Sequence, residues 1–118
     1  MDPQILHANV SDEYFTEERC HILELSNSPN DIGLSIARAR VEPGVTTALH
    51  KVIDTVERYV IQSGDGRVEV EGLEPCNVGP DDVVIIPAGA TQRITNTGDT
   101  DLVFLAICTP KFVPECYE

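Results

Sequence analysis

Turn-forming residues divide this chain into short segments rich in β-branched residues, and this rhythm limits the fold more than any other feature. Clusters of Gly, Pro, Asn and Asp recur about every eight to twelve residues, and no segment shows helical periodicity. The pattern predicts an all-β sandwich or barrel. The expected strands are residues 20–25, 33–41, 46–51, 55–62, 67–70, 82–86, 91–95 and 101–108.

Three turn sequences are expected to join these strands. Residues 64–66 (Gly-Asp-Gly) and 96–99 (Asn-Thr-Gly-Asp) offer the positive φ angles of tight hairpins, which predicts antiparallel pairing on either side. Residues 80–82 (Pro-Asp-Asp) lead into an apolar strand that Pro87 ends.

The chain is predicted to form a single domain. Its 118 residues are enough for one core that needs neither metal nor disulfide bonds, and no repeat or linker divides them. Within this domain, residues 1–18 are expected to form an N-terminal arm or edge strand. Residues 19–109 form the barrel, and residues 110–118 form a tail packed across its surface.

Charge and hydropathy exclude several classes of partner. Twenty acidic and eight basic residues give a formal net charge of -12, which disfavours nucleic acid and anionic lipid. No apolar run approaches the length of about 18 residues that a membrane helix needs, and the first residues lack a secretory signal. A cytoplasmic location is therefore expected. Four arginines remain available for a local basic pocket that binds an anion: Arg38, Arg40, Arg58 and Arg93.

The four cysteines form no Cys-x-x-Cys pair, which argues against a zinc ribbon or a thioredoxin-like site. They are Cys20, Cys76, Cys108 and Cys116. We expect four free thiols, with Cys108 buried at the end of an apolar strand.

Two spaced motifs carry the chemical signal. The first consists of Gly44, His50, Val52, Glu57 and Gly64, and the second of Pro87, Gly89, Gln92 and Asn96. With histidine at positions 52 and 92, these would be the two metal-binding signatures of the cupin family. The chain thus resembles a small single-domain cupin with a reduced ligand set, over about residues 33–117. Asp81 stands where the second motif usually begins with glycine, and Asp tolerates the left-handed conformation that this turn needs.

The resemblance implies a jelly-roll barrel, also called a double-stranded β-helix, and a metal site at its mouth. The implied ligands are His50, Glu57 and Gln92, pointing into one cavity. Val52 cannot bind metal, and the Gln92 carbonyl oxygen is a weaker ligand than imidazole. Such a site would hold a divalent ion of iron, manganese, nickel or zinc, at low occupancy.

Each of these residues also has a structural interpretation. His50 is then a satisfied cavity residue, Glu57 pairs with Arg93 or Arg38, and Gln92 hydrogen-bonds Glu57 or a buried water. Glu57 and Tyr59 share one strand face and are the catalytic candidates, although the Tyr59 hydroxyl in water is the commoner arrangement. The remaining histidines, His7 and His21, are expected to be exposed.

Two functions of different class follow from the resemblance, and whether the chain is an enzyme stays open. The first is a metal-dependent dioxygenase, isomerase or lyase acting on a small molecule. The alternative is a non-catalytic cupin that binds or senses a small molecule without tightly bound metal. A third, ranked last, is a metal-free epimerase with His50 as base and Tyr59 as acid. The resemblance and the need to cover sheet edges also predict a homodimer.

Overall fold

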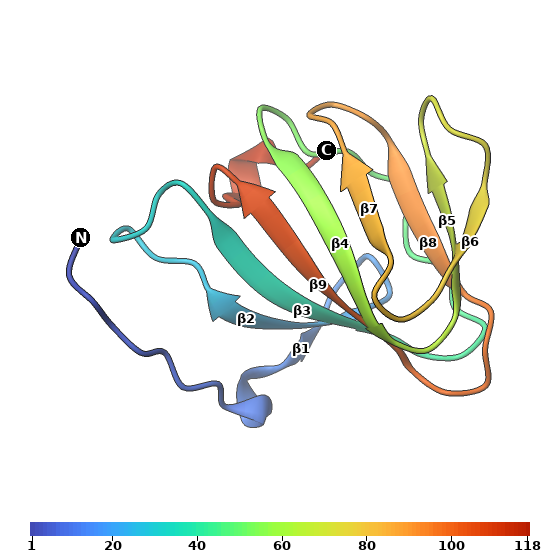
Figure 1. The fold of residues 1–118 in the computed structure, drawn as a ribbon, viewed down its shortest axis with the longest axis horizontal. Helices are drawn as coiled ribbons and strands as arrows, with labels where there is room; N and C mark the ends of the chain where they lie inside the picture. Colours follow the sequence, from blue (N-terminus) through green and yellow to red (C-terminus); the bar gives the residue numbers. More distant parts are fainter.

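The computed structural model describes all 118 residues, and they form two antiparallel sheets that face each other across one core (Figure 1). The larger sheet has the strand order β1-β2-β3-β9-β4-β7 and the smaller one β6-β5-β8. The strands are β1 (Tyr14–Phe15), β2 (His21–Ser26), β3 (Ser35–Val41), β4 (Val56–Ser63), β5 (Gly66–Val70), β6 (Cys76–Val78), β7 (Val83–Ile86), β8 (Gln92–Asn96) and β9 (Leu102–Thr109). Two 3₁₀ turns, η1 (Val10–Asp12) and η2 (Pro114–Cys116), complete the chain. The predicted all-β jelly-roll barrel is confirmed.

The core lies between the two sheets because alternate residues of each strand point inward. The cluster includes Ile61 of β4 and Ile86 of β7 from the larger sheet, and Val68 of β5 and Ile94 of β8 from the smaller one. Each of these aliphatic side chains contributes about 1.5–3 kcal/mol through burial. The same alternation decides which side chains of the larger sheet face the interior beyond this cluster.

Residues 46–51 do not form the predicted strand. Thr46 pairs with Thr95 and His50 with Gln92 as isolated bridges, so the segment holds one residue more than β8 between them. In this bulge the Thr47 hydroxyl accepts the Ile94 amide N–H at 3.0 Å, where a strand would offer a backbone carbonyl. The Thr47 side chain thus replaces one backbone hydrogen bond between this segment and β8. His50 remains bound to β8 through its backbone hydrogen bonds with Gln92.

The turns at residues 64–66 and 96–99 do not close hairpins, which corrects the prediction. β4 pairs with β7 and β9, whereas β5 and β8 pair in the other sheet, so both turns carry the chain between sheets. Gly64 has φ +87°, and a Cβ there would lie 2.7 Å from the Asp101 carbonyl oxygen. Gly98 has no positive φ, while Asp81 has φ 73°, as expected for the turn before β7.

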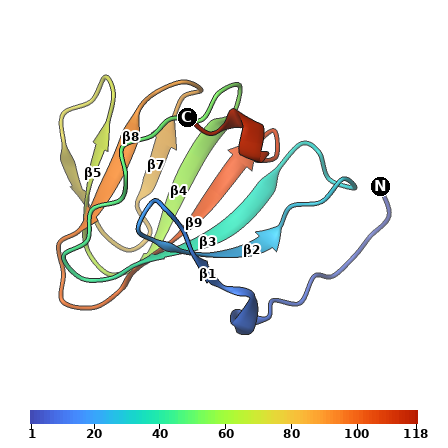
Figure 2. The same cartoon turned by 180° about the vertical axis from the view of Figure 1, so that it is seen from behind.

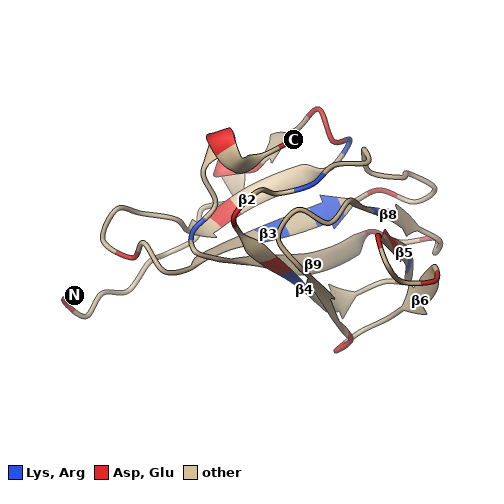
Figure 3. Ribbon diagram, turned by 90° about the horizontal axis from the view of Figure 1, so that it is seen from above, with Lys and Arg blue, Asp and Glu red and all other residues tan.

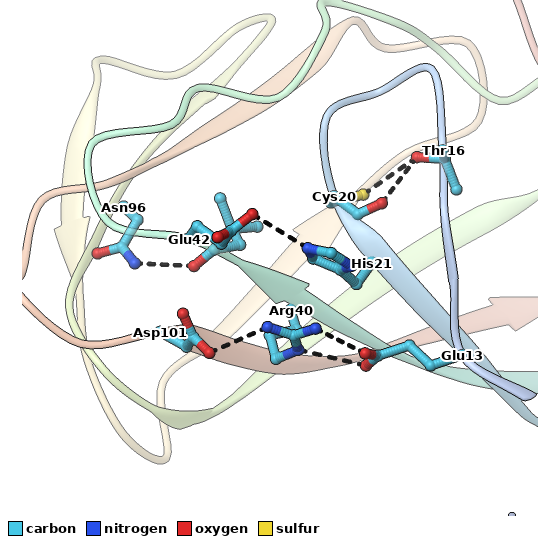
Figure 4. A network of polar contacts seen from close by, with 9 residues as sticks. Glu13, Thr16, Cys20, His21, Arg40, Glu42, Asn96 and Asp101 are labelled. Atoms are coloured by element: carbon cyan, nitrogen blue, oxygen red, sulfur yellow. Dashed lines mark hydrogen bonds and ion pairs between the residues drawn. The ribbon is translucent and has the colours of Figure 1, made fainter. Parts of the chain in front are cut away.

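Polar side chains tie the sheet crossings and the N-terminal segment together (Figure 4). The Asn96 amide donates to the carbonyl oxygens of Val41 and Thr100, both at 2.8 Å. Arg40 of β3 donates to Glu13 at 2.7 Å and to Asp101 at 3.2 Å. The hydrogen bond from Arg40 lowers the pKa of the Glu13 carboxyl below its usual value. The segment before β1 is thereby held against the outer side of the larger sheet.

The remaining sequence predictions concern the cysteines and the membrane. All four cysteines are free, and three of them are buried: Cys20, Cys108 and Cys116. No helix in the structure has the length and apolar character needed to cross a membrane.

Candidate functional site: a cavity inside the barrel

A cavity of about 330 Å³ opens where the interior of the larger sheet is not filled by the core. Inward-facing side chains of β2, β3, β4 and β9 form its floor, and residues 14–18, 47–52 and 112–117 surround it. The space arises because small residues meet across β3 and β9. Ala37 lies opposite Ala106, and Ser35 lies opposite Cys108. Larger side chains at these inward positions would close the cavity.

Three residues of the C-terminal tail, Phe112, Pro114 and Tyr117, line part of this cavity, so the tail does not lie only on the outer surface. Figure 2 shows η2 folded back beside the end of β9. Val52 pairs with Tyr117, and the backbones of Lys51 and Glu118 exchange hydrogen bonds of 2.8 and 2.9 Å. The Tyr117 ring stacks on His50 with centroids 5.1 Å apart. The tail thus holds the His50 ring in place.

His50 forms one polar group in the wall. Its Nδ1 donates to the Ala48 carbonyl oxygen at 2.9 Å, which leaves Nε2 as the acceptor of the neutral ring. This Nε2 lies 3.6 Å from Oε2 of Glu18, longer than a hydrogen bond. Glu18 comes from the loop between β1 and β2, so the fold brings together two residues that are distant in sequence.

Glu57 forms the second polar group and ends a buried chain of hydrogen bonds. The Tyr59 hydroxyl donates to Oε1 of Gln92, and Gln92 Nε2 donates to Oε1 of Glu57 at 2.7 Å. The other carboxylate oxygen, Oε2, accepts only the Cys108 thiol, at a sulfur-oxygen distance of 3.8 Å. The Glu57 carboxylate is therefore fixed in orientation, with one oxygen weakly partnered at the cavity wall.

Burial changes the protonation of these groups. Desolvation raises the pKa of Glu57, against the opposing effects of the Gln92 amide and His50, and desolvation also raises the pKa of Glu18. It raises the pKa of the Cys20 thiol to about 11 and that of Cys108 to about 12, so both thiols are protonated at neutral pH. Two carboxyls with raised pKa values beside a histidine mark this cavity as the candidate functional site.

Three of the four predicted site residues line the cavity, and the fourth does not. His50 and Glu57 line the cavity, as does the Tyr59 ring, whereas Gln92 is fully buried beneath them and is not part of the wall. Tyr59 is itself buried, so its hydroxyl does not reach water. Gln92 takes the alternative role considered for it, as the hydrogen-bonding partner of Glu57.

The proposed pairing of Glu57 with an arginine is wrong. Arg93 binds Glu69 at 2.7 and 3.1 Å on the outside of β8, and the carboxylate near Arg38 is that of Glu13, 3.9 Å away. None of the four arginines lines the cavity, so the basic pocket considered from the sequence is not formed there.

The other two histidines lie outside the cavity wall. His7 is exposed, as expected. His21 is half-buried and contacts Glu42 at 3.1 Å.

The donor groups do not fit a divalent metal as the structure arranges them. No three His, Cys, Asp or Glu side chains come close enough together to hold an ion. The Gln92 carbonyl oxygen, the third implied ligand, already accepts the Tyr59 hydroxyl, and Val52 fills the position of a second histidine. Metal binding by His50, Glu57 and Gln92 would require Tyr59 to lose its partner.

Glu18 and Tyr117 were missed in the sequence. Both lie outside the two motifs, and their positions near His50 depend on the loop before β2 and on the return of the tail. The acidic run at Glu17-Glu18 gave no sign of an inward direction, because consecutive charged residues commonly lie in solvent.

Comparison with known proteins agrees with the fold and the motifs. The family model described as "Cupin domain" matches residues 37–108. An oxalate-binding protein of Thermotoga maritima is 36% identical over 91 residues, which cover 76% of this chain and 73% of the relative.

Solved structures show the same architecture. A predicted oxalate decarboxylase from Thermotoga maritima is 25% identical with a TM-score of 0.73, over 89% of this chain and 93% of its own. The nucleoside dehydratase Pac13 from Streptomyces is similar in fold alone, at 15% identity and a TM-score of 0.78, over 98% and 90% of the two chains. From the family match, the relative and the barrel together, we conclude that this chain belongs to the cupin family.

Proposed function

We propose that this cupin binds a small molecule in the barrel cavity without a tightly held metal ion. The observation that carries the proposal is the cavity of about 330 Å³, which has a mainly hydrophobic lining and a polar group of Glu18, His50 and Glu57. Small-molecule sites commonly combine an apolar wall with a few fixed polar groups. The relative named as oxalate-binding supports this class of function.

A thermal-shift screen of metabolites, in the presence of a chelator, tests the proposal. Compounds that bind raise the melting temperature because they bind only the folded chain. Ala106→Leu fills the cavity floor and is expected to abolish these shifts. Ile107→Leu, at the next residue on the opposite face, is the matched control and is expected to keep them. Shifts that survive Ala106→Leu would place binding elsewhere.

The metal-dependent alternative is tested on the same protein. Elemental analysis after purification without chelator is expected to find much less than one equivalent of iron, manganese, nickel or zinc. The double variant Val52→His/Gln92→His, which restores the full motif, is the positive control and is expected to gain metal. A stoichiometric metal in the natural chain that is lost in His50→Ala would overturn the metal-free proposal.

For a reaction in this cavity, the groups favour proton transfer at Glu57. Glu57 lines the cavity, its Oε2 has only the weak thiol donor of Cys108, and burial raises its pKa, as suits a general acid or base. The Tyr59 ring lines the cavity, whereas its hydroxyl acts through Gln92 and positions the carboxylate. With a ligand that is turned over, Glu57→Gln is expected to abolish turnover and Tyr59→Phe to reduce it only partly.

We also infer that the chain forms a homodimer through the outer face of the larger sheet. Ile36 lies opposite Ile107, and Val60 lies opposite Leu105, on the side that points away from the cavity. On β7, Val83 lies opposite Val60 and is 56% exposed, and Ile85 lies opposite Arg58 and is 60% exposed. A second copy would cover these apolar side chains.

A further inference from the structure

The ionisable groups of the cavity wall are almost all acidic. Four acidic side chains line it, the exposed Glu17 and Glu24 and the less exposed Glu18 and Glu57, whereas no lysine or arginine does. Lys111, whose charge acts on Glu24, donates to the Asn27 side chain at 3.3 Å and is not part of the wall. The only basic group in the wall is the imidazole of His50. Acidic positions also outnumber basic ones over the whole chain (Figure 3), so cations are attracted at long range.

Aromatic rings are concentrated in the same wall. All three tyrosines and two of the three phenylalanines line the cavity. The rings of Tyr59 and Phe104 pack with centroids 4.3 Å apart, and Tyr117 covers His50. Aromatic faces carry partial negative charge and attract ammonium groups, most strongly where water is excluded.

One buried carboxylate oxygen lacks a strong donor. Glu57 is 8% exposed, and its Oε2 accepts only the weak thiol donor of Cys108 at 3.8 Å. Gln92 and Tyr59 prevent the carboxylate from turning toward another partner. An N–H donor entering the cavity would complete the hydrogen bonds of this oxygen.

We propose that the ligand is a small organic cation, a protonated amine with an apolar body, whose ammonium group binds between Glu57 and Glu18. The apolar body packs on Ala37, Ala106 and the aromatic rings. This inference rests on the proposed binding function and gives it a ligand class. A dicarboxylate such as oxalate, the ligand named for the Thermotoga maritima relative, would meet four carboxylates and no guanidinium or ammonium group.

Isothermal titration with four matched probes at pH 7 and low salt tests the charge preference. The probes are benzylamine, benzyl alcohol, benzoate and oxalate. Benzylamine is expected to bind with one site and about tenfold more tightly than benzyl alcohol, since a close ion pair away from water contributes at least that much. Benzoate and oxalate are expected to give no binding heat.

Matched variants assign the effect to the cavity. Glu57→Gln and Glu18→Gln are each expected to weaken benzylamine binding about tenfold. Glu69→Gln removes the same charge on the outer surface and is expected to leave it unchanged. Circular dichroism of each variant checks that it is folded, and Glu18→Gln preserves the test if Glu57→Gln does not fold.

The results separate the cation preference from the more general small-molecule binding. Benzoate or oxalate binding as tightly as benzylamine, and lost in Ala106→Leu, would overturn the cation inference and leave the binding function in place. Equal binding of benzylamine and benzyl alcohol would do the same. Binding of none of the four probes would overturn the cation inference, and the metabolite screen would then decide separately on the binding function.

Discussion

Gln92 shows how one residue can change role while the fold around it is kept. Its amide joins Tyr59 to Glu57 through two hydrogen bonds and is fully buried. It therefore fixes the orientation of the Glu57 carboxylate without lining the cavity. A histidine at this position would present a metal ligand, whereas glutamine fixes the carboxylate of Glu57. In this structure residue 92 therefore positions Glu57 by a hydrogen bond.

Gln92→Leu is expected to destabilise the protein strongly. It leaves the Glu57 carboxylate and the Tyr59 hydroxyl buried without this partner, and each loss costs about 1–3 kcal/mol of unfolding free energy. Arg93→Leu, which removes an exposed ion pair on the next residue, is expected to cost much less, because solvent screens such a pair. Urea unfolding measures both. Equal losses would show that the buried bonds contribute no more than a surface pair.

At the residue scale, motif spacing was enough to predict that His50 and Glu57 line the cavity. It could not predict the direction of the Gln92 hydrogen bonds, because an amide can bind metal or neighbours equally well from the same position. Glu18 was not predicted because its contact with His50 depends on how the loop between β1 and β2 folds back.

The element scale is where sequence patterns were most ambiguous. Alternation and turn residues gave most strands, yet the Gly-Asp-Gly turn joins two sheets where a hairpin was expected. Both connections need tight turns of the same residue types, so local sequence cannot separate them. The bulge at residues 46–51 depends on the Thr47 hydroxyl bonding to β8, which is also a tertiary contact.

The close approach at the sheet crossing predicts a large effect of Gly64→Ala. A side chain at φ +87° costs about 1–2 kcal/mol, and the Cβ would also meet the backbone of Asp101 at 2.7 Å. Gly72→Ala is the matched control, since φ is +91° there but the surrounding space is open. Chemical unfolding should show the greater loss for Gly64→Ala. Equal losses would contradict a close backbone contact at the crossing.

The Glu13–Arg40 pair that ties the N-terminal segment to β3 predicts a pH dependence. Since the folded-state pKa of Glu13 is lowered, its contribution to stability is present above the unfolded-state pKa of about 4.3 and is lost as pH falls through the lower folded-state value. Glu13→Gln is expected to reduce the unfolding free energy by about 0.5–1 kcal/mol at pH 7. Urea unfolding at pH 7 and at strongly acidic pH measures the difference from the natural chain, which should vanish in acid. A difference that stays constant would contradict the ion-pair assignment.

On the scale of the whole molecule, the barrel was predictable because short segments rich in β-branched residues recur between clusters of turn-forming residues. The cavity was harder to predict, because its volume comes from small residues that meet across strands, such as Ala37 opposite Ala106. Which small residues become neighbours is known only when the strand register is known. The covering by the tail depends in the same way on the complete fold.

The proposed dimer is a property of the whole molecule and has its own test. Light scattering after gel filtration is expected to give twice the chain mass for the natural protein. Ile85→Glu, which places a charge on the outer sheet face, is expected to give the monomer mass. Gly72→Ala, on an exposed loop away from that face, should remain dimeric. A natural chain that elutes as a monomer at high concentration would contradict the interface.

The central claim is a cupin cavity that binds its ligand without a metal ion, and diffraction from crystals tests it most directly. Crystals grown from protein purified without chelator, soaked with benzylamine, would be measured across the iron and zinc absorption edges. We expect ligand density beside Glu57 and Glu18, with no anomalous peak in the cavity. An anomalous peak bound by His50, Glu57 and Gln92, with the Tyr59 hydroxyl displaced from Gln92, would contradict the account.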